Sequence, residues 1–237
     1  KKFKPDLICT PECSNIITND KSYLLENTTD EVNCPIIKTA KSYAKENNIN
    51  INIGSLLLKK KNKKKLVNRS IFINSKGSII KRYDKIHMFD VNINKKETHR
   101  ESKTFQAGKS IASINLNNIK IGFTICYDLR FPHLFRKLAK KGSEIILVPA
   151  AFTVPSGKAH WEIMVRSRAI ENSLFVIATN MCGTHHSNRK TYGHSLLVNP
   201  WGEIVTRAKS KPSILNSEIN LKEVGEARSK IPSIFHD

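Results

Sequence analysis

Cys126 is the residue in this 237-residue sequence whose type and position best suit a nucleophile. It stands where a β-rich run, residues 119–125, gives way to a segment that leads into a helix. A strand-to-helix junction exposes a side chain at the C-terminal edge of a sheet, where open α/β folds place their sites. Backbone N–H groups of the following helix would lower the pKa of a thiol and bind an oxyanion. The alternative is a buried cysteine that acts as a small apolar side chain.

A thiol that cleaves an amide also needs a base and a group that stabilises the oxyanion. Glu12 follows the short apolar run 7–10, and Lys85 follows a predicted strand at residues 78–82. Considered alone, each would be a solvated surface charge. Four histidines remain candidate bases, although no Cys–His protease motif surrounds the cysteine: His87, His133, His160 and His194. Spacing by itself therefore does not identify the partners of Cys126.

Three motifs, taken in order, resemble those of the nitrilase (carbon–nitrogen hydrolase) superfamily. They are Leu-Ile-Cys-Thr-Pro-Glu12, Arg-Tyr-Asp-Lys85-Ile-His-Met-Phe-Asp and Ile-Cys126-Tyr-Asp-Leu-Arg-Phe-Pro. The resemblance runs over essentially the whole chain and implies a thiol amidase with a Glu12–Lys85–Cys126 triad. It also implies that Glu101 is a second active-site glutamate. In such an enzyme the cysteine forms a thioester with the acyl group, and neither a metal nor an organic cofactor is required.

The second half of the chain resembles the Nit amidase branch of that superfamily. The stretches that carry this likeness are Pro149-Ala-Ala-Phe152, Cys182-Gly-Thr-His-His186, Tyr192-Gly-His-Ser195 and Asn199-Pro-Trp-Gly202. Within the branch, Cys-Gly-x-His-His is more similar to deaminated-glutathione amidases than to ω-amidases. The expected reaction is hydrolysis of deaminated glutathione to 2-oxoglutarate and cysteinylglycine. The alternative is ω-amidase activity on 2-oxoglutaramate-like acids, with the same triad and a differently shaped pocket.

The resemblance also implies a set of substrate-binding positions: Tyr127, Arg130, Phe152 and Ser156. Arg130 would hold a substrate carboxylate, because a guanidinium group pairs with a carboxylate through two hydrogen bonds. From sequence alone, Arg130 could equally be a surface arginine on a helix, and Phe152 could be a core residue.

The charge of the chain raises a different class of function. Forty Lys and Arg against twenty Asp and Glu give a net charge of +20, and basic surfaces bind nucleic acid by releasing counterions. The lysines are nevertheless scattered, and the one dense run, residues 59–65, is predicted to be a basic hairpin loop. No RNA- or DNA-binding motif is present. We therefore expect a small-molecule amide as partner, with a non-catalytic basic binding protein as the alternative.

Cysteine spacing and hydropathy bear on metal binding, disulfides and the cellular location of the protein. Cys9 and Cys13 have no matching second pair, so a zinc ribbon is not expected, and disulfides are not expected either. The longest apolar stretch, residues 145–152, is far shorter than the roughly 20 residues that span a bilayer. The N-terminus lacks the apolar core of a secretory signal. These features predict a cytoplasmic enzyme that does not bind membranes.

Strands that alternate with helices predict one α/β domain over residues 1–237. The predicted strands are 7–10, 51–58, 66–73, 78–82, 119–125, 145–148, 174–179, 195–198, 204–207 and 214–219. The predicted helices are 35–46, 134–139 (ending before Gly142) and 159–172, and residues 92–108 are predicted to be a long loop. The resemblance implies a four-layer α-β-β-α sandwich and a homodimer or higher homo-oligomer. Relatives begin with a further strand and helix before the position of Lys1, so we expect an N-terminally incomplete domain.

Overall fold

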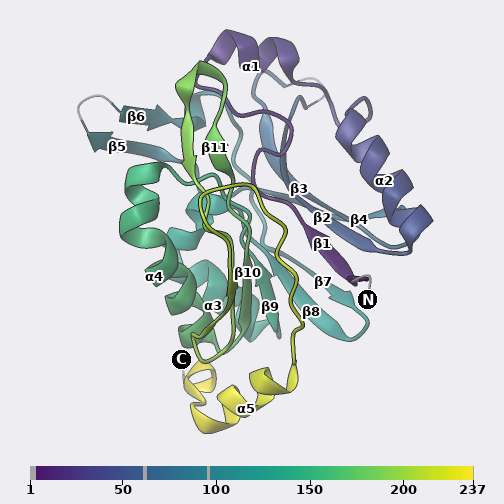
Figure 1. Ribbon diagram of the computed structural model, residues 1–237, viewed down its shortest axis with the longest axis vertical. Coiled ribbons are helices and arrows are strands. Elements are labelled where there is room, and N and C mark those ends of the chain that lie inside the picture. Colours follow the sequence, from purple (N-terminus) through teal and green to yellow (C-terminus); the bar gives the residue numbers. More distant parts are fainter. Residues whose placement is uncertain (1–3, 61–62, 95–96, 237) are drawn as a thin grey trace.

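The computed structural model describes residues 4–60, 63–94 and 97–236 of the chain (Figure 1). Two β-sheets form its centre. The first has the strand order β1-β2-β3-β4, in which β1 runs parallel to β2 and the other neighbours are antiparallel. Its strands are β1 (Leu7–Cys9), β2 (Asn50–Leu58), β3 (Val67–Ile73) and β4 (Ile79–Asp84).

The second sheet has the order β14-β13-β10-β9-β8-β7, with parallel pairing only among β8, β9 and β10. Its strands are β7 (Ala112–Leu116), β8 (Ile119–Phe123), β9 (Ile145–Leu147), β10 (Phe175–Ala178), β13 (Leu196–Val198) and β14 (Ile204–Arg207). Every residue of β9 is buried, as expected for a strand in the middle of a sheet that is covered on both faces.

Helices cover the outer faces of both sheets, which completes the predicted α-β-β-α layers (Figure 1). The helix α2 (Pro35–Asn47) packs on the first sheet, whereas α3 (Pro132–Lys140) and α4 (Val154–Asn172) pack on the second. Two further helices are α1 (Lys21–Asn27) and α5 (Lys222–Lys230). Successive side chains of β3 point to opposite faces of the first sheet. Ile71 and Ile73 pack with α2 on one face, whereas the ring of Phe72 meets that of Phe123 edge-on, with centroids 6.0 Å apart.

At Gly54, β2 lies in close contact with the segments that follow β1 and β9. A β-carbon built there would lie 1.8 Å from the Thr10 carbonyl oxygen and 2.6 Å from the Cβ of Pro149. Both neighbours lie next to predicted catalytic residues. Thr10 stands two residues before Glu12, and the Pro149 carbonyl accepts the N–H of Cys126 at 2.8 Å. The absence of a side chain at Gly54 thus allows these segments to meet.

The prediction of a long loop over residues 92–108 was wrong. The chain forms a hairpin of β5 (Asp90–Asn94) and β6 (Glu97–Arg100), followed by a 3₁₀ turn at Glu101–Lys103; residues 95–96 lie outside the described part. The strand β5 (Asp-Val-Asn-Ile-Asn) alternates polar and apolar side chains over only five residues, and β6 (Glu-Thr-His-Arg) contains no large apolar residue, so the pattern over residues 92–108 as a whole is polar. Backbone pairing forms the hairpin without an apolar pattern on both strands.

Three other predictions need correction. Residues 214–219 are not a strand: Ile214 is 88% exposed, and an apolar composition does not supply a neighbouring strand to pair with. A 3₁₀ turn at Cys126–Arg130, not an α-helix, follows the nucleophile position. Helix α4 begins at Val154, five residues earlier than predicted, because Thr153 caps it and Pro155 suits its first turn.

The other predicted elements are confirmed with end shifts of a few residues. The basic run between β2 and β3 connects those strands as predicted, apart from residues 61–62, which lie outside the described part. Helix α3 ends at Lys140, two residues before Gly142, which has a φ of +91°. No helix in the described ranges is both long and apolar enough to cross a bilayer.

We expect Gly54→Ala to lower the free energy of unfolding by about 1–3 kcal/mol, because the added methyl group meets backbone atoms that cannot rotate away. Gly225→Ala is the matched control, since a β-carbon at Gly225 in α5 meets nothing within 4 Å and alanine favours a helix. Urea unfolding of both variants measures the difference. Equal stabilities would contradict a close contact of the sheets at Gly54.

Candidate active site

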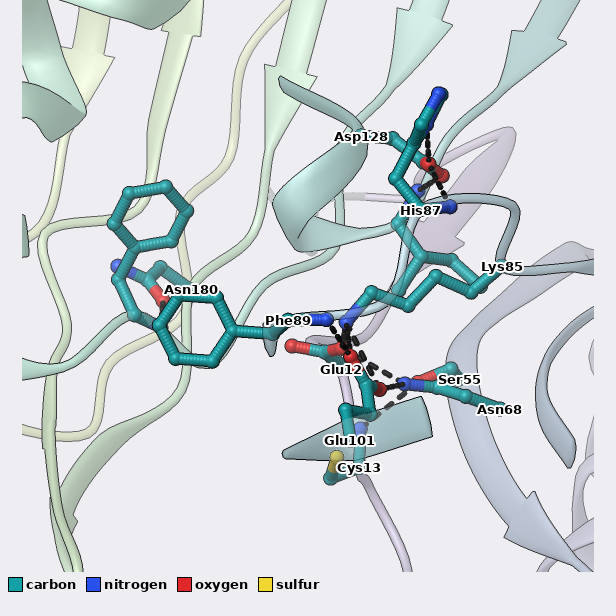
Figure 2. Close-up of polar contacts among 12 residues, drawn as sticks. Glu12, Cys13, Ser55, Asn68, Lys85, His87, Phe89, Glu101, Asp128 and Asn180 are labelled. Carbon is teal, nitrogen blue, oxygen red and sulfur yellow. Dashed lines mark hydrogen bonds and ion pairs between the residues drawn. The ribbon is translucent and has the colours of Figure 1, made fainter. Parts of the chain in front are cut away.

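Four predicted catalytic residues, Glu12, Lys85, Glu101 and Cys126, meet at a cavity of about 460 Å³. The Lys85 ammonium group lies between two carboxylates, 3.1 Å from Glu12 Oε1 and 2.9 Å from Glu101 Oε2 (Figure 2). Lys85 is only 2% exposed and Glu12 only 4%. The thiol of Cys126 hydrogen-bonds to the Glu12 carboxylate. The fold therefore brings together a thiol, a carboxylate and a cation from segments far apart in the chain.

Strand ends and short turns hold these side chains. Glu12 lies three residues beyond β1, and Lys85 directly follows β4, where its N–H donates to the Asn68 carbonyl at 2.9 Å. Glu101 begins the 3₁₀ turn after β6, and its Oε2 accepts the backbone N–H of Phe89 at 2.6 Å. This hydrogen bond links the turn to the segment that follows Lys85.

Cys126 has a left-handed backbone, with a φ of +48°. A non-glycine residue in this region is destabilised by about 1–2 kcal/mol and remains there only when its surroundings require it. The Cys126 N–H donates to the Pro149 carbonyl at 2.8 Å, and the Ala151 N–H donates to the thiol sulfur. The sharp turn places the sulfur at the cavity beside Glu12.

The charges of Glu12 and Lys85 stabilise each other. Burial alone would raise the pKa of Glu12, but the charge of Lys85 and hydrogen bonds from Cys126, Lys85 and Asn68 outweigh it, so this pKa lies below 4.5. Burial likewise favours neutral Lys85, yet Glu101 and Glu12 hold its pKa well above 10.5. Near neutral pH Glu12 is thus a carboxylate and Lys85 an ammonium group.

The pKa of the Cys126 thiol is raised well above 9.0, first by burial and then by the negative charge of Glu12. The expectation that a following helix would lower this pKa was therefore wrong. No α-helix begins at Cys126, and the neighbouring carboxylate outweighs the favourable charge of Lys85. The resting site holds a neutral thiol against an ionised carboxylate.

Sequence reasoning missed two polar residues that support the cluster. The Asn68 amide donates to Glu12 Oε1 at 2.8 Å and lies 3.4 Å from Glu101 Oε1. Asp128 is fully buried and accepts the Tyr83 hydroxyl at 2.7 Å and the Ile125 N–H at 2.9 Å. Asp128 could have been noticed because it is an acidic residue within an apolar stretch, and a buried carboxylate needs hydrogen-bond partners. Asn68 in a strand offered no such signal.

The histidines that remained candidate bases have other contacts. His87 Nδ1 lies 2.7 Å from Asp128 Oδ1 (Figure 2). The His87 ring also stacks on that of Phe131, with centroids 3.5 Å apart. Among the described residues, none of the four histidines lines the cavity. Glu12 is therefore the base nearest to the thiol. No group of three or more His, Cys, Asp or Glu in the described ranges could hold a metal ion.

All four predicted substrate-binding residues line the same cavity: Tyr127, Arg130, Phe152 and Ser156. The guanidinium carbon of Arg130 lies 5.9 Å from the centre of the Tyr127 ring and 5.7 Å from that of Phe152. Arg130 also contacts His160 at 3.3 Å but makes no ion pair with any described carboxylate. The Ser156 hydroxyl is hydrogen-bonded to Thr153 at 2.8 Å.

Comparison with known proteins places this architecture in a family. Residues 1–229 match the family model described as carbon-nitrogen hydrolase. A deaminated glutathione amidase from Yersinia enterocolitica is 36% identical over 235 residues, which cover 98% of this chain and 81% of the relative. One from Synechocystis sp. is 39% identical over 73% of this chain and 64% of its own length. The NitFhit protein of C. elegans superposes with a TM-score of 0.91 at 32% identity, covering 98% of this chain and 57% of that one.

Replacing Asn68 by alanine should lower the free energy of unfolding by about 1–3 kcal/mol, because a buried carboxylate loses a hydrogen bond. Asn33→Ala is the control: it removes surface hydrogen bonds to Asp30 and should change stability by less than about 0.5 kcal/mol. Urea unfolding at pH 7 tests both variants. A stability loss confined to Asn33→Ala would contradict the supporting role of Asn68.

Proposed function

This chain belongs to the carbon–nitrogen hydrolase family and is an amidase of that family, and from this premise we propose that it hydrolyses deaminated glutathione with Cys126 as nucleophile. The observation that carries the proposal is the buried contact of a neutral thiol with an ionised carboxylate, beside a lysine held in its charged form. This arrangement suits the attack of sulfur on an uncharged amide carbonyl.

In the first step, Glu12 takes the proton of Cys126 while the sulfur attacks the amide carbon. The hydrogen bond between the two side chains already provides the path for that proton. Because the thiol has a raised pKa, sulfur becomes nucleophilic only as the carboxylate removes its proton. General-base catalysis of this kind contributes about 10²–10⁴-fold to the rate.

The negative charge that develops on the carbonyl oxygen needs donors. Lys85 is fixed in its charged form by Glu12 and Glu101, and its ammonium group lies at the same cavity as the thiol. The Tyr127 N–H is the second donor. The first hydrogen bond of the 3₁₀ turn runs from the Asp128 N–H to the Ile125 carbonyl, so the turn itself does not use the N–H of Tyr127. One such donor is worth about 3–4 kcal/mol in the transition state.

Collapse of the tetrahedral intermediate breaks the carbon–nitrogen bond. Glu12, now protonated, gives its proton to the departing amine, and the acyl group stays on Cys126 as a thioester. A water molecule then gives its proton to the same carboxylate and attacks the thioester. Release of the acid returns the proton to the sulfur, so Glu12 acts as base and acid in turn.

Glu101 acts as a positioning residue. Its carboxylate contacts Lys85 through both oxygens, at 3.1 and 2.9 Å, and is itself held by the Phe89 N–H. When Glu12 is protonated during the cycle, Glu101 still pairs with the ammonium group. Lys85 thus remains available to the oxyanion throughout the cycle.

Arg130 is the residue proposed to bind the carboxylate of the acyl portion. It lines the cavity four residues beyond Cys126, beside the rings of Tyr127 and Phe152. With no described carboxylate to pair with, its guanidinium group can take a substrate carboxylate through two hydrogen bonds. Phe152 and Ser156 would shape the wall around that acyl portion.

The names of the relatives support deaminated glutathione as substrate, and the Cys182-Gly-Thr-His-His186 stretch supports it from sequence. ω-Amidase activity on 2-oxoglutaramate is the second candidate, because both molecules carry the same acyl portion. The alternative of a non-catalytic basic binding protein loses its support, since the chain is an amidase by family. The homo-oligomeric state and the cytoplasmic location stay predictions.

With deaminated glutathione, the wild-type protein should release 2-oxoglutarate and cysteinylglycine, and Cys126→Ala should reduce turnover by at least about a thousandfold. Cys182→Ala, which removes a thiol that does not line the catalytic cavity, is the matched control and should retain activity. Product analysis by mass spectrometry measures both acids. No release from folded protein with reduced Cys126 would contradict this substrate and make 2-oxoglutaramate the next to test.

The pH dependence of kcat/KM should have its acid limb below pH 4.5. Glu12 has a lowered pKa, so its base form persists above that pKa and is lost only as the pH falls through it. No loss from Lys85 is expected below pH 10.5, because its pKa is raised. Initial rates across pH, with circular dichroism to verify folding, test this; an acid limb centred near pH 6 would argue against Glu12 as the base.

A further inference from the structure

The rim of the catalytic cavity contains a second arginine, Arg189, whose role no catalytic step explains. It follows a 3₁₀ turn, His186–Asn188, in the hairpin of β11 (Cys182–Thr184) and β12 (Lys190–Tyr192). This hairpin lies next to α1, as Figure 1 shows. Arg189 is half-buried there, so its charge lies at the edge of the same cavity that holds Cys126.

The turn of this hairpin is held against the segment that leads into α1. Thr18 Oγ1 lies 2.9 Å from both His186 Nδ1 and Ser187 Oγ. The His186 ring stacks on Tyr23, with centroids 3.8 Å apart and planes 7° apart. These contacts fix the backbone before Arg189, so its side chain starts from a defined position at the rim.

The guanidinium group of Arg189 keeps most of its donors. Nη1 donates to the Thr18 carbonyl at 3.3 Å, and within the described ranges the side chain makes no ion pair. Arginine carries five N–H donors, so a fork remains for a ligand. The positive charge of Arg189 also acts on Cys13, the residue after Glu12. Burial raises the pKa of the Cys13 thiol, and the charge of Arg189 acts in the opposite direction.

Arg189 and Arg130 lie on different walls. Arg130 contacts His160 and Met164 of α4, whereas Arg189 contacts the segment before α1. A third arginine at the cavity, Arg100, is already bonded to the Val91 and His99 carbonyls and to Asn92. Two half-buried guanidinium groups without a described carboxylate therefore face one cavity from two sides.

Deaminated glutathione carries two carboxylates, one on the 2-oxoglutarate portion and one at the end of the cysteinylglycine portion. The amide bond to be cleaved lies between them. 2-Oxoglutaramate has only the first, because its leaving group is ammonia. A cavity lined by two guanidinium groups, each without a described carboxylate partner, matches the longer, doubly charged molecule better than the shorter one.

We propose that Arg189 binds the carboxylate of the leaving amine portion, while Arg130 binds that of the acyl portion, so that Arg189 selects amides with a carboxylate on both sides. This inference rests on the proposed function and names the part of the site that sets its substrate range. A site built to pair a charged group rejects the analogue that lacks this group, because the guanidinium is then left without its partner.

The test compares wild type with Arg189→Gln, Arg189→Lys and Lys190→Gln on deaminated glutathione, its C-terminal amide and 2-oxoglutaramate. Arg189→Gln should lower the ratio of kcat/KM for deaminated glutathione to that for 2-oxoglutaramate by about 10- to 100-fold. Arg189→Lys should fall between, because it keeps the charge without the fork. Lys190→Gln removes the same charge from an exposed neighbour that does not line the cavity, and should leave the ratio unchanged.

The C-terminal amide closes a double-mutant cycle. If Arg189 pairs with the leaving-group carboxylate, wild type should lose about as much on the amide as Arg189→Gln loses on the acid, and the two losses should not add. Equal losses on all three substrates, or additive losses, would overturn the inference. A ratio unaffected by Arg189→Gln would overturn it as well.

A binding measurement separates this inference from the proposed reaction. Calorimetry in the Cys126→Ala background gives the Kd of deaminated glutathione with and without Arg189→Gln. Weaker binding by about 10- to 100-fold supports the role of Arg189 even if wild type fails to cleave the molecule, which would contradict only the proposed function. Binding that does not depend on Arg189 overturns the inference whatever the turnover.

Discussion

The ammonium group of Lys85, almost completely withdrawn from water between Glu12 and Glu101, is the interaction on which the rest of the site depends. The two buried charges, Glu12 and Lys85, are tolerated only because each has a partner and further hydrogen bonds, including those with the partly buried Glu101. Removing one partner from such a cluster leaves an uncompensated buried charge, at a cost of about 3–5 kcal/mol. The amide of Asn68 and the N–H of Phe89 belong to this requirement as much as Lys85 does, because they give second hydrogen bonds to the carboxylate oxygens that Lys85 contacts, Glu12 Oε1 and Glu101 Oε2.

The same cluster decides which protonation state reaches the substrate. A thiol that is buried beside a carboxylate stays protonated, in contrast to cysteines whose neighbours are cations or helix N-termini. Cys13 is buried nearby and its thiol also has a raised pKa, yet it follows Glu12 in the chain and is not hydrogen-bonded to that carboxylate. Both cysteines have a left-handed backbone, with a φ of +57° at Cys13 and +48° at Cys126. What distinguishes Cys126 is therefore its contact with a base, not an intrinsically acidic thiol.

The ends of the strands and the connections between strands have different roles at the cavity. Strand ends and tight turns position Glu12, Lys85 and Cys126, and the segments before Glu12 and after β9 are in close contact with β2 at Gly54. The β5–β6 and β11–β12 hairpins and the start of α4 instead supply walls of the cavity, including Arg100 and Arg189, whereas Arg130 ends the turn that begins at Cys126. Reactive groups on rigid ends and selective groups on connections are the arrangement expected when one chemistry serves different substrates.

The order of three motifs predicted Glu12, Lys85 and Cys126, and the family resemblance added Glu101. Local residue patterns, such as the apolar stripe of α3 and the helix formers of α2, predicted α2, α3, β2 and β14. Local sequence records which side chains are apolar, so it predicts elements that bury one face. It did not predict the polar β5–β6 hairpin, and it wrongly made a strand of residues 214–219, because strand pairing requires a neighbouring edge. Asn68, Asp128 and the raised pKa of Cys126 also came only from the tertiary structure. Their effects depend on groups that folding alone brings together: Lys85 meets Glu12 across 73 positions of sequence, and Asn68 meets it across 56.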